Sequence, residues 1–404
     1  MKQNEKHVAR IVDVAPNAVT FFVGPVSQTV DWPANMETPK QGEVYEISFS
    51  PDLEIHRKLA TPLENIDWPN SDTMRWRKQN ASGKNRMEIL KQRHLIKRAV
   101  RDYLHEQDFI EIDMPLLVPG ATPDAEIDSF AFEDRYLVTS CEYQIKRMEI
   151  GGFDRSYTFT QNYRLGDLSR YRNPEFTMIE WARVGQTLTD IEADAEQFLN
   201  RANQALGGQK IIQYQGHTID ITPPWDRISV RGAIEKHIGV ALEDFSAQSL
   251  IKAAEAANLT VKEEWREDTI FLFSLVMEHL QTMLGFGKPI FLQEWPKLMT
   301  SSADLDASGK FTQRSELFIA GVELSDGFPS LTDYERQKTS FQQQVDRRKE
   351  IGHMYVEIDH KYLESMREGF PSGAGMALGF DRLVMVLTDQ ATLNDVLAFG
   401  WNEL

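Results

Sequence analysis

The chain has 404 residues, of which 41% are hydrophobic, a formal net charge of -17 and a pI near 5.1. This length allows two or three domains with sizeable cores, and the acid excess disfavours nucleic-acid binding over the surface as a whole. The single cysteine, Cys141, excludes an internal disulfide and a multi-thiolate metal site. Without an apolar run of about 18 residues or a signal-like N-terminus, we expect a cytoplasmic protein with no membrane partner.

Short apolar segments between residues 8 and 50, separated by Gly, Pro and Asn, predict β-strands. We therefore predict a small all-β domain of the OB or SH3 type over residues 1–57. It holds five Lys or Arg against eight Asp or Glu, which is not the charge pattern of a nucleic-acid binder. For Phe21 and Phe22, core packing is favoured over a base-stacking platform.

A stretch rich in Pro, Asn, Asp and Ser follows and predicts a linker over residues 58–84. Ten Lys or Arg lie between Arg75 and Arg101, with Glu88 as the only acid. A solvated helix face whose charges pair with acids elsewhere is favoured here over an RNA or acidic-partner contact.

Hydrophobic periodicity over residues 85–404 predicts a mainly antiparallel sheet flanked by helices, an α+β fold, because the strands lack regular crossover helices. The spacing predicts a long helix over 87–106, followed by a strand at 109–112 that ends before Pro115. Further helices are predicted at 189–206 and 246–285, and further strands at 155–164, 175–184, 289–295 and 315–326.

The segment from Tyr157 to Val184 has the pattern of two strands joined by a polar loop. Period-two alternation places Arg164 on a polar face at the end of the first strand, and Phe176 and Glu180 on one face of the second. An aromatic ring stacks on a base, a carboxylate holds an amine, and the planar fork of an arginine suits a phosphate. This pattern indicates nucleotide chemistry.

The sequence RSELFIAGVELSDGF, from Arg314, predicts a hairpin that turns at Ala320-Gly321. In that register residue 318 faces 323, and Glu316 lies diagonal to Glu323 on the same face. A carboxylate pair beside phosphates suits Mg²⁺. Two exposed strand acids are the alternative, and the neighbouring motifs favour the metal.

The glycines at 373, 375 and 379 allow close backbone approach before a helix that carries Arg382. The segment lacks a Walker lysine and a strand-linked GxGxxG, which excludes P-loop and Rossmann sites. Arg164 and Arg382 are therefore the two cations expected to grip one polyphosphate.

In order, YRLGDLSRYRNPEFTMIE, the Glu316–Glu323 spacing, GMALGFDR and the terminal LNDVLAF resemble motifs of the class II aminoacyl-tRNA synthetases, in the lysine, aspartate and asparagine subgroup. The resemblance covers residues 85–404 and implies a homodimer formed through the helix and strand that end at Pro115. Within the subgroup, TSCEYQIKRM resembles TSPEYHMKRL of the family that ligates (R)-β-lysine to elongation factor P, and Ala377 matches that family's alanine.

The resemblance implies a two-step reaction in which an amino acid and ATP form an aminoacyl-adenylate before the acyl group is transferred. It implies Arg164 and Arg382 as catalytic residues and Glu316 and Glu323 as Mg²⁺ ligands. The implied ATP-binding residues are Arg164, Gly166, Arg172, Asn173, Phe176, Glu316, Glu323, Leu324, Gly379 and Arg382. The implied amino-acid-binding residues are Ser140, Glu142, Glu180, Ala182, Asp326, Ser330 and Ala377.

Several positions depart from the family pattern. Gly166 stands where the family has an adenine-binding Glu, with Asp167 next to it as a substitute. In the lysine pocket, Asp326 replaces Asn, Ser330 replaces the side-chain-binding Glu, and Ala182 replaces Tyr. A buried ammonium that loses such partners loses about 1.5–3 kcal/mol for each, so lysine is disfavoured as the substrate.

The leading hypothesis is an ATP-dependent amino-acid ligase whose acceptor is a protein, such as an elongation factor P-like protein, or a small-molecule amine. An aminoacyl-tRNA synthetase or tRNA-modifying enzyme is the second, and a catalytically silent paralogue that binds or senses is the third. Cys141 is interpreted as a packing residue rather than a reactive thiol. Residues 185–288 carry no motif, and the amino acid and acceptor stay open.

Overall fold

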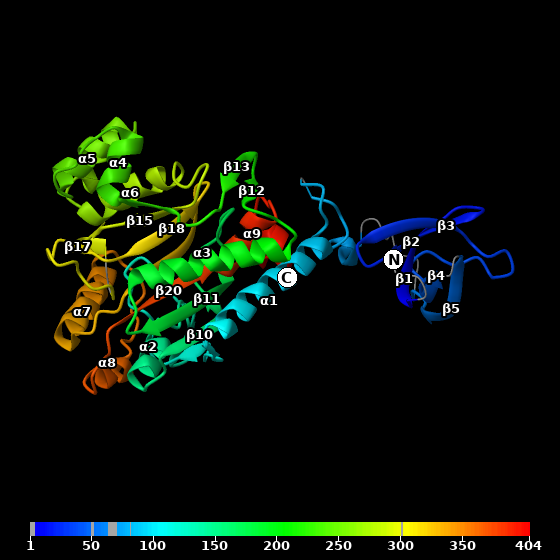
Figure 1. Cartoon of the computed structure of the whole chain (residues 1–404), viewed down its shortest axis with the longest axis horizontal. Helices are drawn as coiled ribbons and strands as arrows, with labels where there is room; N and C mark the ends of the chain where they lie inside the picture. Colours follow the sequence, from blue (N-terminus) through cyan, green and yellow to red (C-terminus); the bar gives the residue numbers. More distant parts are fainter. Residues whose placement is uncertain (1–4, 50–51, 64–70, 81, 300–301) are drawn as a thin grey trace. The chain divides into compact units, whose positions relative to one another are not determined.

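The computed structural model describes residues 5–49, 52–63, 71–80, 82–299 and 302–404. The chain divides into two compact units, and the boundary between them falls between Lys91 and Gln92. Each unit has a sheet of its own (Figure 1). Among the described helices, none combines the length and apolar character that crossing a bilayer requires.

The first unit is built on a five-stranded antiparallel sheet in the order β3-β2-β1-β4-β5. Its core includes Ile11, Phe21 and Ile47, which are at most 1% exposed. Phe21 is a core residue as predicted, whereas Phe22 is half-buried with the Arg77 guanidinium 5.1 Å from its ring centroid. The strands are β1 (His7–Val14), β2 (Ala18–Val23), β3 (Val26–Asp31), β4 (Val44–Phe49) and β5 (Leu53–Ala60).

Strand β5 was not predicted, and it continues three residues past the expected domain end at residue 57. In its sequence, LEIHRKLA, the alternation of apolar and polar residues stops at three consecutive polar residues. This end of the strand is exposed on both faces, so no apolar face marks it as a strand. A short 3₁₀ helix, Asp72–Met74, also lies in the segment predicted as linker, with Met74 buried.

The second unit contains an eight-stranded sheet in the order β14-β15-β18-β19-β20-β11-β10-β6. Every neighbouring pair is antiparallel except β6–β10 and β14–β15 at the two ends, which confirms the predicted α+β class. The strands of this sheet are β6 (Ile110–Glu111), β10 (Arg155–Tyr163), β11 (Glu175–Val184), β14 (Asp226–Ser229), β15 (Ile290–Gln293), β18 (Ser315–Ile319), β19 (Val322–Pro329) and β20 (Gly373–Gly379). Shorter strands form smaller sheets: β7 (Leu117–Val118), β8 (Ala131–Phe132), β9 (Arg135–Leu137), β12 (Ile211–Tyr214), β13 (His217–Asp220), β16 (Trp295–Pro296) and β17 (Phe311–Thr312).

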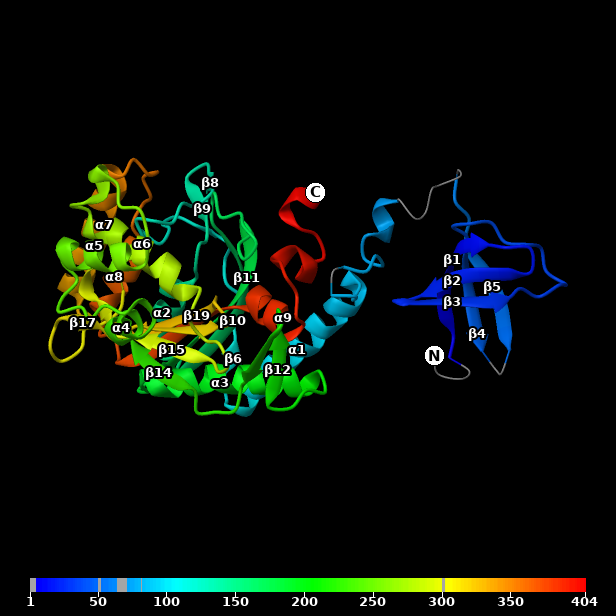
Figure 2. The same cartoon turned by 90° about the horizontal axis from the view of Figure 1, so that it is seen from above.

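Helix α3 runs along one face of this sheet, with α1 beside it (Figures 1 and 2). The buried carboxylate of Asp194 in α3 links this helix to α1 and to strand β11. It accepts hydrogen bonds from the Tyr103 hydroxyl at 2.7 Å, the Trp181 indole at 3.1 Å and the Arg183 guanidinium at 2.7 and 2.8 Å. The helices are α1 (Arg86–Glu106), α2 (Glu142–Ile150), α3 (Leu188–Ala205), α4 (Val230–Ile238), α5 (Ala247–Ala256), α6 (Thr269–Gln281), α7 (Tyr334–Glu350), α8 (His360–Met366) and α9 (Phe380–Leu387).

The single helix predicted over 246–285 is wrong, because the structure has two helices there. The first ends at Ala256, and Asn258 follows in a left-handed conformation with φ of 58°. Asp268 then begins α6 by accepting a hydrogen bond from the Phe271 amide, which satisfies a free donor of the first turn. Apolar residues on both sides of this break pack into one cluster, although the segment between them, residues 262–268, is mostly charged.

Candidate active site

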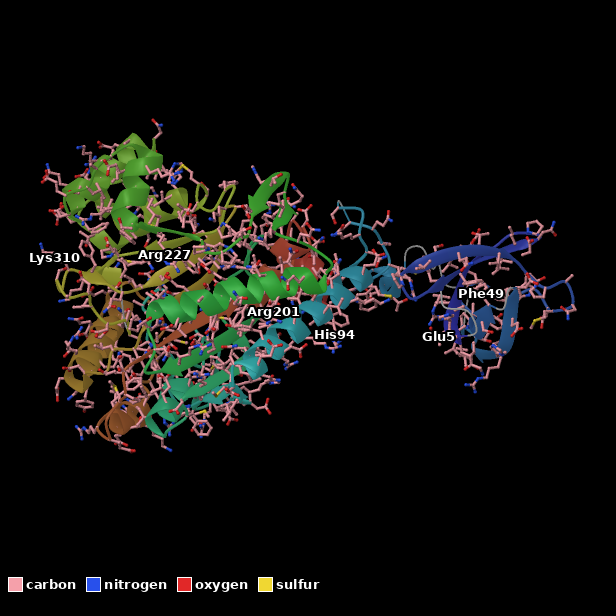
Figure 3. All side chains as sticks on the ribbon, in the orientation of Figure 1. Glu5, Phe49, His94, Arg201, Arg227 and Lys310 are labelled. Carbon is pink, nitrogen blue, oxygen red and sulfur yellow. The ribbon has the colours of Figure 1, made fainter. Side chains whose placement is uncertain are left out.

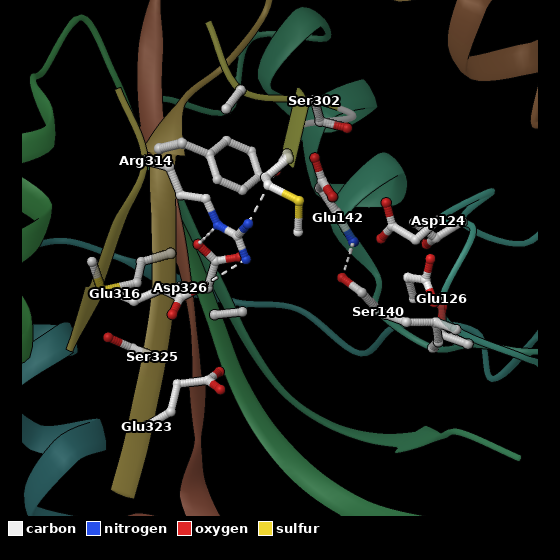
Figure 4. Close-up of a pocket in the computed structure, with 18 of the residues that line it drawn as sticks. Asp124, Glu126, Ser140, Glu142, Ser302, Arg314, Glu316, Glu323, Ser325 and Asp326 are labelled. Atoms are coloured by element: carbon white, nitrogen blue, oxygen red, sulfur yellow. Dashed lines mark hydrogen bonds and ion pairs between the residues drawn. The ribbon is translucent and has the colours of Figure 1, made fainter. Parts of the chain in front are cut away.

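A single cavity of about 1290 Å³ collects the predicted site residues. Its lining comes from α2, the loop after β10, and strands β11, β18, β19 and β20, with the α4–α6 region contributing at one side. Figure 4 shows the part of the cavity formed by the β18–β19 hairpin and α2. Of the residues predicted for ATP or amino-acid binding, Gly166 alone is missing from the lining.

Arg164 and Phe176 form one end of the cavity. The Arg164 guanidinium lies 5.2 Å from the Phe176 ring centroid, and its Nε has no hydrogen-bond partner among the described residues. Burial lowers the pKa of Arg164, against the opposing pull of Asp167 and Glu323. An arginine remains charged after such a shift, so this half-buried cation is available to an anionic ligand.

Arg382 is held in place before any ligand arrives. Its Nη1 donates to the Glu323 carbonyl at 2.7 Å, its Nε donates to the Tyr171 carbonyl at 3.1 Å, and the Glu323 carboxylate lies 3.7 Å away. Arg382 and Arg164 line the same cavity and are close enough for their charges to interact. Two cations that line one cavity, one of them held in place by hydrogen bonds, suit a polyphosphate.

Gly166 lies outside the cavity because the chain turns there. It is exposed with φ of 84°, and a Cβ at this position would meet nothing within 4 Å. Asp167, the expected substitute, does line the cavity and lies 3.5 Å from Arg172. The loop therefore presents a carboxylate one residue later than the family pattern.

The β18–β19 hairpin turns at Ala320-Gly321 and pairs Phe318 with Glu323, as predicted. The predicted pairing of Glu316 is wrong by one residue, because ideal pairing would place it opposite Ser325. An irregularity between Leu317 and Phe318 shifts the register, and Glu316 therefore lies directly opposite Asp326.

This shift completes a row of residues across four neighbouring strands. Glu180 of β11 pairs with Ala377 of β20, Ala377 pairs with Asp326 of β19, and Asp326 pairs with Glu316 of β18. Directly opposed residues share a face of the sheet, so three carboxylates line one floor with a small residue between them. The methyl group of Ala377 leaves the space above this floor open.

Arg314 neutralises part of that floor and was missed by the sequence analysis. Its Nη2 lies 2.7 Å from Glu316, its Nε donates to Asp326 at 2.9 Å, and its Nη1 donates to the Met299 carbonyl at 3.1 Å (Figure 4). Burial opposes its charge, but the carboxylates of Asp326 and Glu316 more than reverse this and raise the pKa of Arg314. The sequence did contain a signal for Arg314: it lies two residues before Glu316, and residues two apart in a strand share a face.

The carboxylates of Glu316 and Glu323 fit a Mg²⁺ ion that is bound mainly by phosphates. Burial raises the pKa of Glu316, Arg314 lowers it, and the negative charge of Glu323 raises it further. A cation between the two carboxylates would relieve that repulsion. Mg²⁺ commonly takes one or two carboxylates and completes its shell with phosphate oxygens and water. Among the described residues, no three acidic, histidine or cysteine side chains cluster as a self-contained metal site.

The end of the cavity predicted to bind the amino acid, called the amino-acid end below, is built around buried Glu180. Its carboxylate accepts hydrogen bonds from the Ser140 hydroxyl at 2.8 Å and the Cys141 amide at 3.0 Å, and burial raises its pKa. Cys141 is fully buried against Ile145 and Ala182, and burial raises the pKa of its thiol well above the usual value. The interpretation of Cys141 as a packing residue is therefore supported.

One face of α2 also lines this end. Glu142, Ile145, Lys146 and Glu149 follow the i, i+3, i+4, i+7 spacing, and all four reach the cavity. Lys146 donates to Glu142 at 2.6 Å and lies 5.2 Å from the Phe328 ring centroid. Lys146 and Glu149 were not predicted as site residues, although their spacing from Glu142 places them on its face.

The basic stretch on α1 is largely occupied within the second unit. Arg93 lies 2.6 Å from Asp381, and Arg101 lies 2.5 Å from Glu111. The ammonium of Lys97 lies 4.6 Å from the Phe159 ring centroid. These contacts support the interpretation as a paired helix face over that of an RNA-binding patch.

An antiparallel sheet thus brings two arginines and a row of carboxylates to one cavity, as the class II synthetase motifs imply. The family model described as tRNA synthetases class II (D, K and N) matches residues 72–403. The chain belongs to this family.

Curated relatives that match the chain are named lysine–tRNA ligases. The one from Pelotomaculum thermopropionicum is 34% identical over 330 residues, which cover 77% of this chain and 63% of the relative. The one from Legionella pneumophila (Philadelphia 1) is 31% identical over 386 residues, covering 89% of this chain and 75% of the relative. The chain therefore spans between three fifths and three quarters of the length of these relatives.

Proposed function

We propose that the protein is an ATP-dependent amino-acid ligase that forms an aminoacyl-adenylate. It transfers the acyl group to a protein, such as an elongation factor P-like protein, or to a small-molecule amine. The observation that carries this proposal is the joint position of Arg164, Phe176, Arg382 and the Glu180 row on one cavity. Residues suited to bind the base, the phosphates and the amino acid thus line one cavity.

In the first step, an oxygen of the amino-acid carboxylate attacks the α-phosphorus of ATP. The bond between that phosphorus and the bridging oxygen breaks, and pyrophosphate leaves with the electron pair. Arg164 would stabilise charge that develops on the α-phosphate, and Arg382 would hold the terminal phosphate. Phe176 offers its ring to adenine. When bound, Mg²⁺ neutralises phosphate charge, and Glu316 and Glu323 are the residues that would hold it.

In the second step, a nucleophile of the acceptor attacks the acyl carbon, AMP leaves with the electrons of the acyl–oxygen bond, and the nucleophile releases its proton to solvent. The wild-type protein, incubated with ATP, Mg²⁺ and labelled pyrophosphate, should exchange label into ATP with at least one member of an amino-acid panel. Absence of exchange with every amino acid would refute the proposal.

Lysine is not expected to be the preferred amino acid. Ala182 lacks the phenolic hydroxyl of the family's Tyr, and Ser330 lacks the carboxylate of the family's Glu. The double variant Ala182→Tyr/Ser330→Glu restores both groups at positions that line the cavity. We expect it to raise kcat/KM for lysine-dependent exchange by roughly 10- to 100-fold over wild type. Faster exchange with lysine than with any other amino acid in the wild-type protein would contradict this expectation.

The family name and the names of the relatives favour tRNA as the second candidate acceptor. The chain offers weak support for it, because its net charge is -17 and Arg93 and Arg101 of α1 already pair with carboxylates. We therefore expect no tRNA gel shift, even at low salt. Binding with a log–log salt slope of several units would favour tRNA, since phosphate contacts release counterions.

We also propose a homodimer formed through the region from α1 to Pro115. Exposed apolar side chains support it: Leu95 and Ile110 lie within this region, and Leu116 and Leu117 directly follow it. Exposed apolar groups of this kind favour association with a second copy.

A further inference from the structure

A buried carboxyl group of α2 reaches the amino-acid end of the cavity without a partner. Glu149 is 4% exposed, and its Oε2 has no hydrogen-bond partner among the described residues. Its position in the cavity lining distinguishes it from a carboxyl enclosed by apolar core. Buried polar groups are nearly always hydrogen-bonded, so this one indicates a donor that is absent from the free protein.

The nearest cation does not satisfy Glu149. Lys146, one turn earlier, already donates to Glu142 at 2.6 Å. Burial raises the pKa of Glu149 to about 7, Lys146 partly offsets this, and the charge of Glu142 adds to it. A second positive group would ionise Glu149 fully and bind it with a charge-assisted hydrogen bond.

Charge at this end of the cavity favours a substrate with two cationic groups. Lys146 and Arg314 each pair with acids of this end, and those acids outnumber them. One ammonium, the α-amino group of the amino acid, leaves an excess of negative charge. The acids that line this end include Glu142, Glu149, Glu180, Glu316 and Asp326, with Asp124 and Glu126 beside Glu142.

The geometry sets the length and bulk of the side chain. Glu142 and Glu149 are seven residues apart on one helix face, a separation of about 10 Å along the axis. That distance accommodates an amino acid whose α-ammonium lies near Glu142 and whose head group lies four or five bonds beyond Cα. Ala182 and Ser330 are small and line the same cavity, which leaves room for a head group larger than a primary ammonium.

Building on the proposed ligase function, we propose that Glu149 is the specificity residue for a long, cationic amino-acid side chain of the guanidinium or N-substituted amine class. It replaces, from a different element of the fold, the carboxylate that the family pattern places at residue 330. Lysine is then disfavoured by the shape of the head-group site, and cationic charge is still required.

Arginine and citrulline test the proposal, because they match in length and shape but differ in charge. Wild-type protein should favour arginine over citrulline by roughly 10- to 100-fold in kcat/KM for pyrophosphate exchange. In Glu149→Gln this ratio should fall to near one, mainly through a higher KM for arginine. The control Glu243→Gln removes an exposed acid from the lining of the same cavity and should keep the wild-type ratio.

Calorimetric titration with the two amino acids, without ATP, separates this proposal from the proposed ligase function. If exchange is absent but wild-type protein binds arginine in preference to citrulline, and Glu149→Gln does not, the ligase function fails and the role of Glu149 stands. Equal binding of the two amino acids by wild type, or an unchanged ratio in a folded Glu149→Gln protein, overturns the proposal. Glu149→Asp keeps the charge and should retain part of the preference; loss equal to that of Glu149→Gln would also overturn it.

Discussion

Replacing Arg164 with alanine is expected to lower the rate of pyrophosphate exchange by about 10²- to 10³-fold. A preorganised donor aimed at developing charge typically contributes that much to kcat. The guanidinium has an unpartnered Nε, and it stacks on Phe176 rather than pairing with a carboxylate. Its removal therefore leaves no buried acid without a partner, and the thermal midpoint should change little.

Arg164→Lys separates charge from shape, because lysine keeps the charge but lacks the planar fork. It should recover only a small part of the lost rate. Arg201→Ala is the matched control: this arginine is exposed on the outer surface of α3 (Figure 3) and pairs with Glu106 at 2.9 Å. Wild-type exchange in Arg164→Ala, or a loss of similar size in Arg201→Ala, would contradict the assigned role.

Arg314→Met is expected to abolish exchange and to lower the free energy of unfolding by about 3 kcal/mol. The substitution leaves Glu316 and Asp326 facing each other across the hairpin with no cation between them. Removal of one member of a buried ionic group is costly because the remaining charges stay desolvated. Denaturant unfolding measures the stability change.

Two further variants make this result specific. Arg314→Met/Asp326→Leu removes one of the stranded charges and should recover part of the lost stability. Arg336→Ala breaks an exposed pair with Asp304 at 3.0 Å and should cost less than about 1 kcal/mol. If Arg314→Met were as stable as Arg336→Ala, Arg314 would not be holding the floor of the cavity together.

Local patterns predicted much of the fold correctly. Helix 87–106 and the strands at 155–164 and 175–184 match α1, β10 and β11 within one residue at each end. These segments are long; the helix is periodic with one buried face, whereas β11 is buried on both faces from Thr177 to Arg183. The class of the sheet followed from the lack of regular crossover helices between strands.

The missed features depend on contacts that the local pattern does not encode. Strand β5 carries exposed charges on both faces, so its pairing with β4 leaves no alternation. The break between α5 and α6 contains a charged segment, residues 262–268, and the apolar residues on its two sides pack into one core. That shared core is a tertiary contact, as is the pairing that forms β5.

The candidate site was predictable where motifs set the chemistry and unpredictable where register and distance set it. The sequence contained Arg164, Arg382 and Glu323 at recognisable spacings. One extra residue in β19, Leu324, placed Glu316 opposite Asp326, and ideal hairpin pairing gave no sign of it. The position of Glu149 in the cavity depends on how α2 packs, and α2 is separated in sequence from the strands that complete the lining.

The most direct test of the central claim is a single-turnover reaction analysed by mass spectrometry. Excess wild-type protein is mixed with ATP, Mg²⁺ and one amino acid at a time, without any acceptor, and the bound nucleotide is identified after quenching. We predict an aminoacyl-adenylate and free pyrophosphate in equal amounts, with a long cationic amino acid giving the highest yield. Recovery of intact ATP with every amino acid, or of ADP and phosphate in place of the adenylate, would contradict the account.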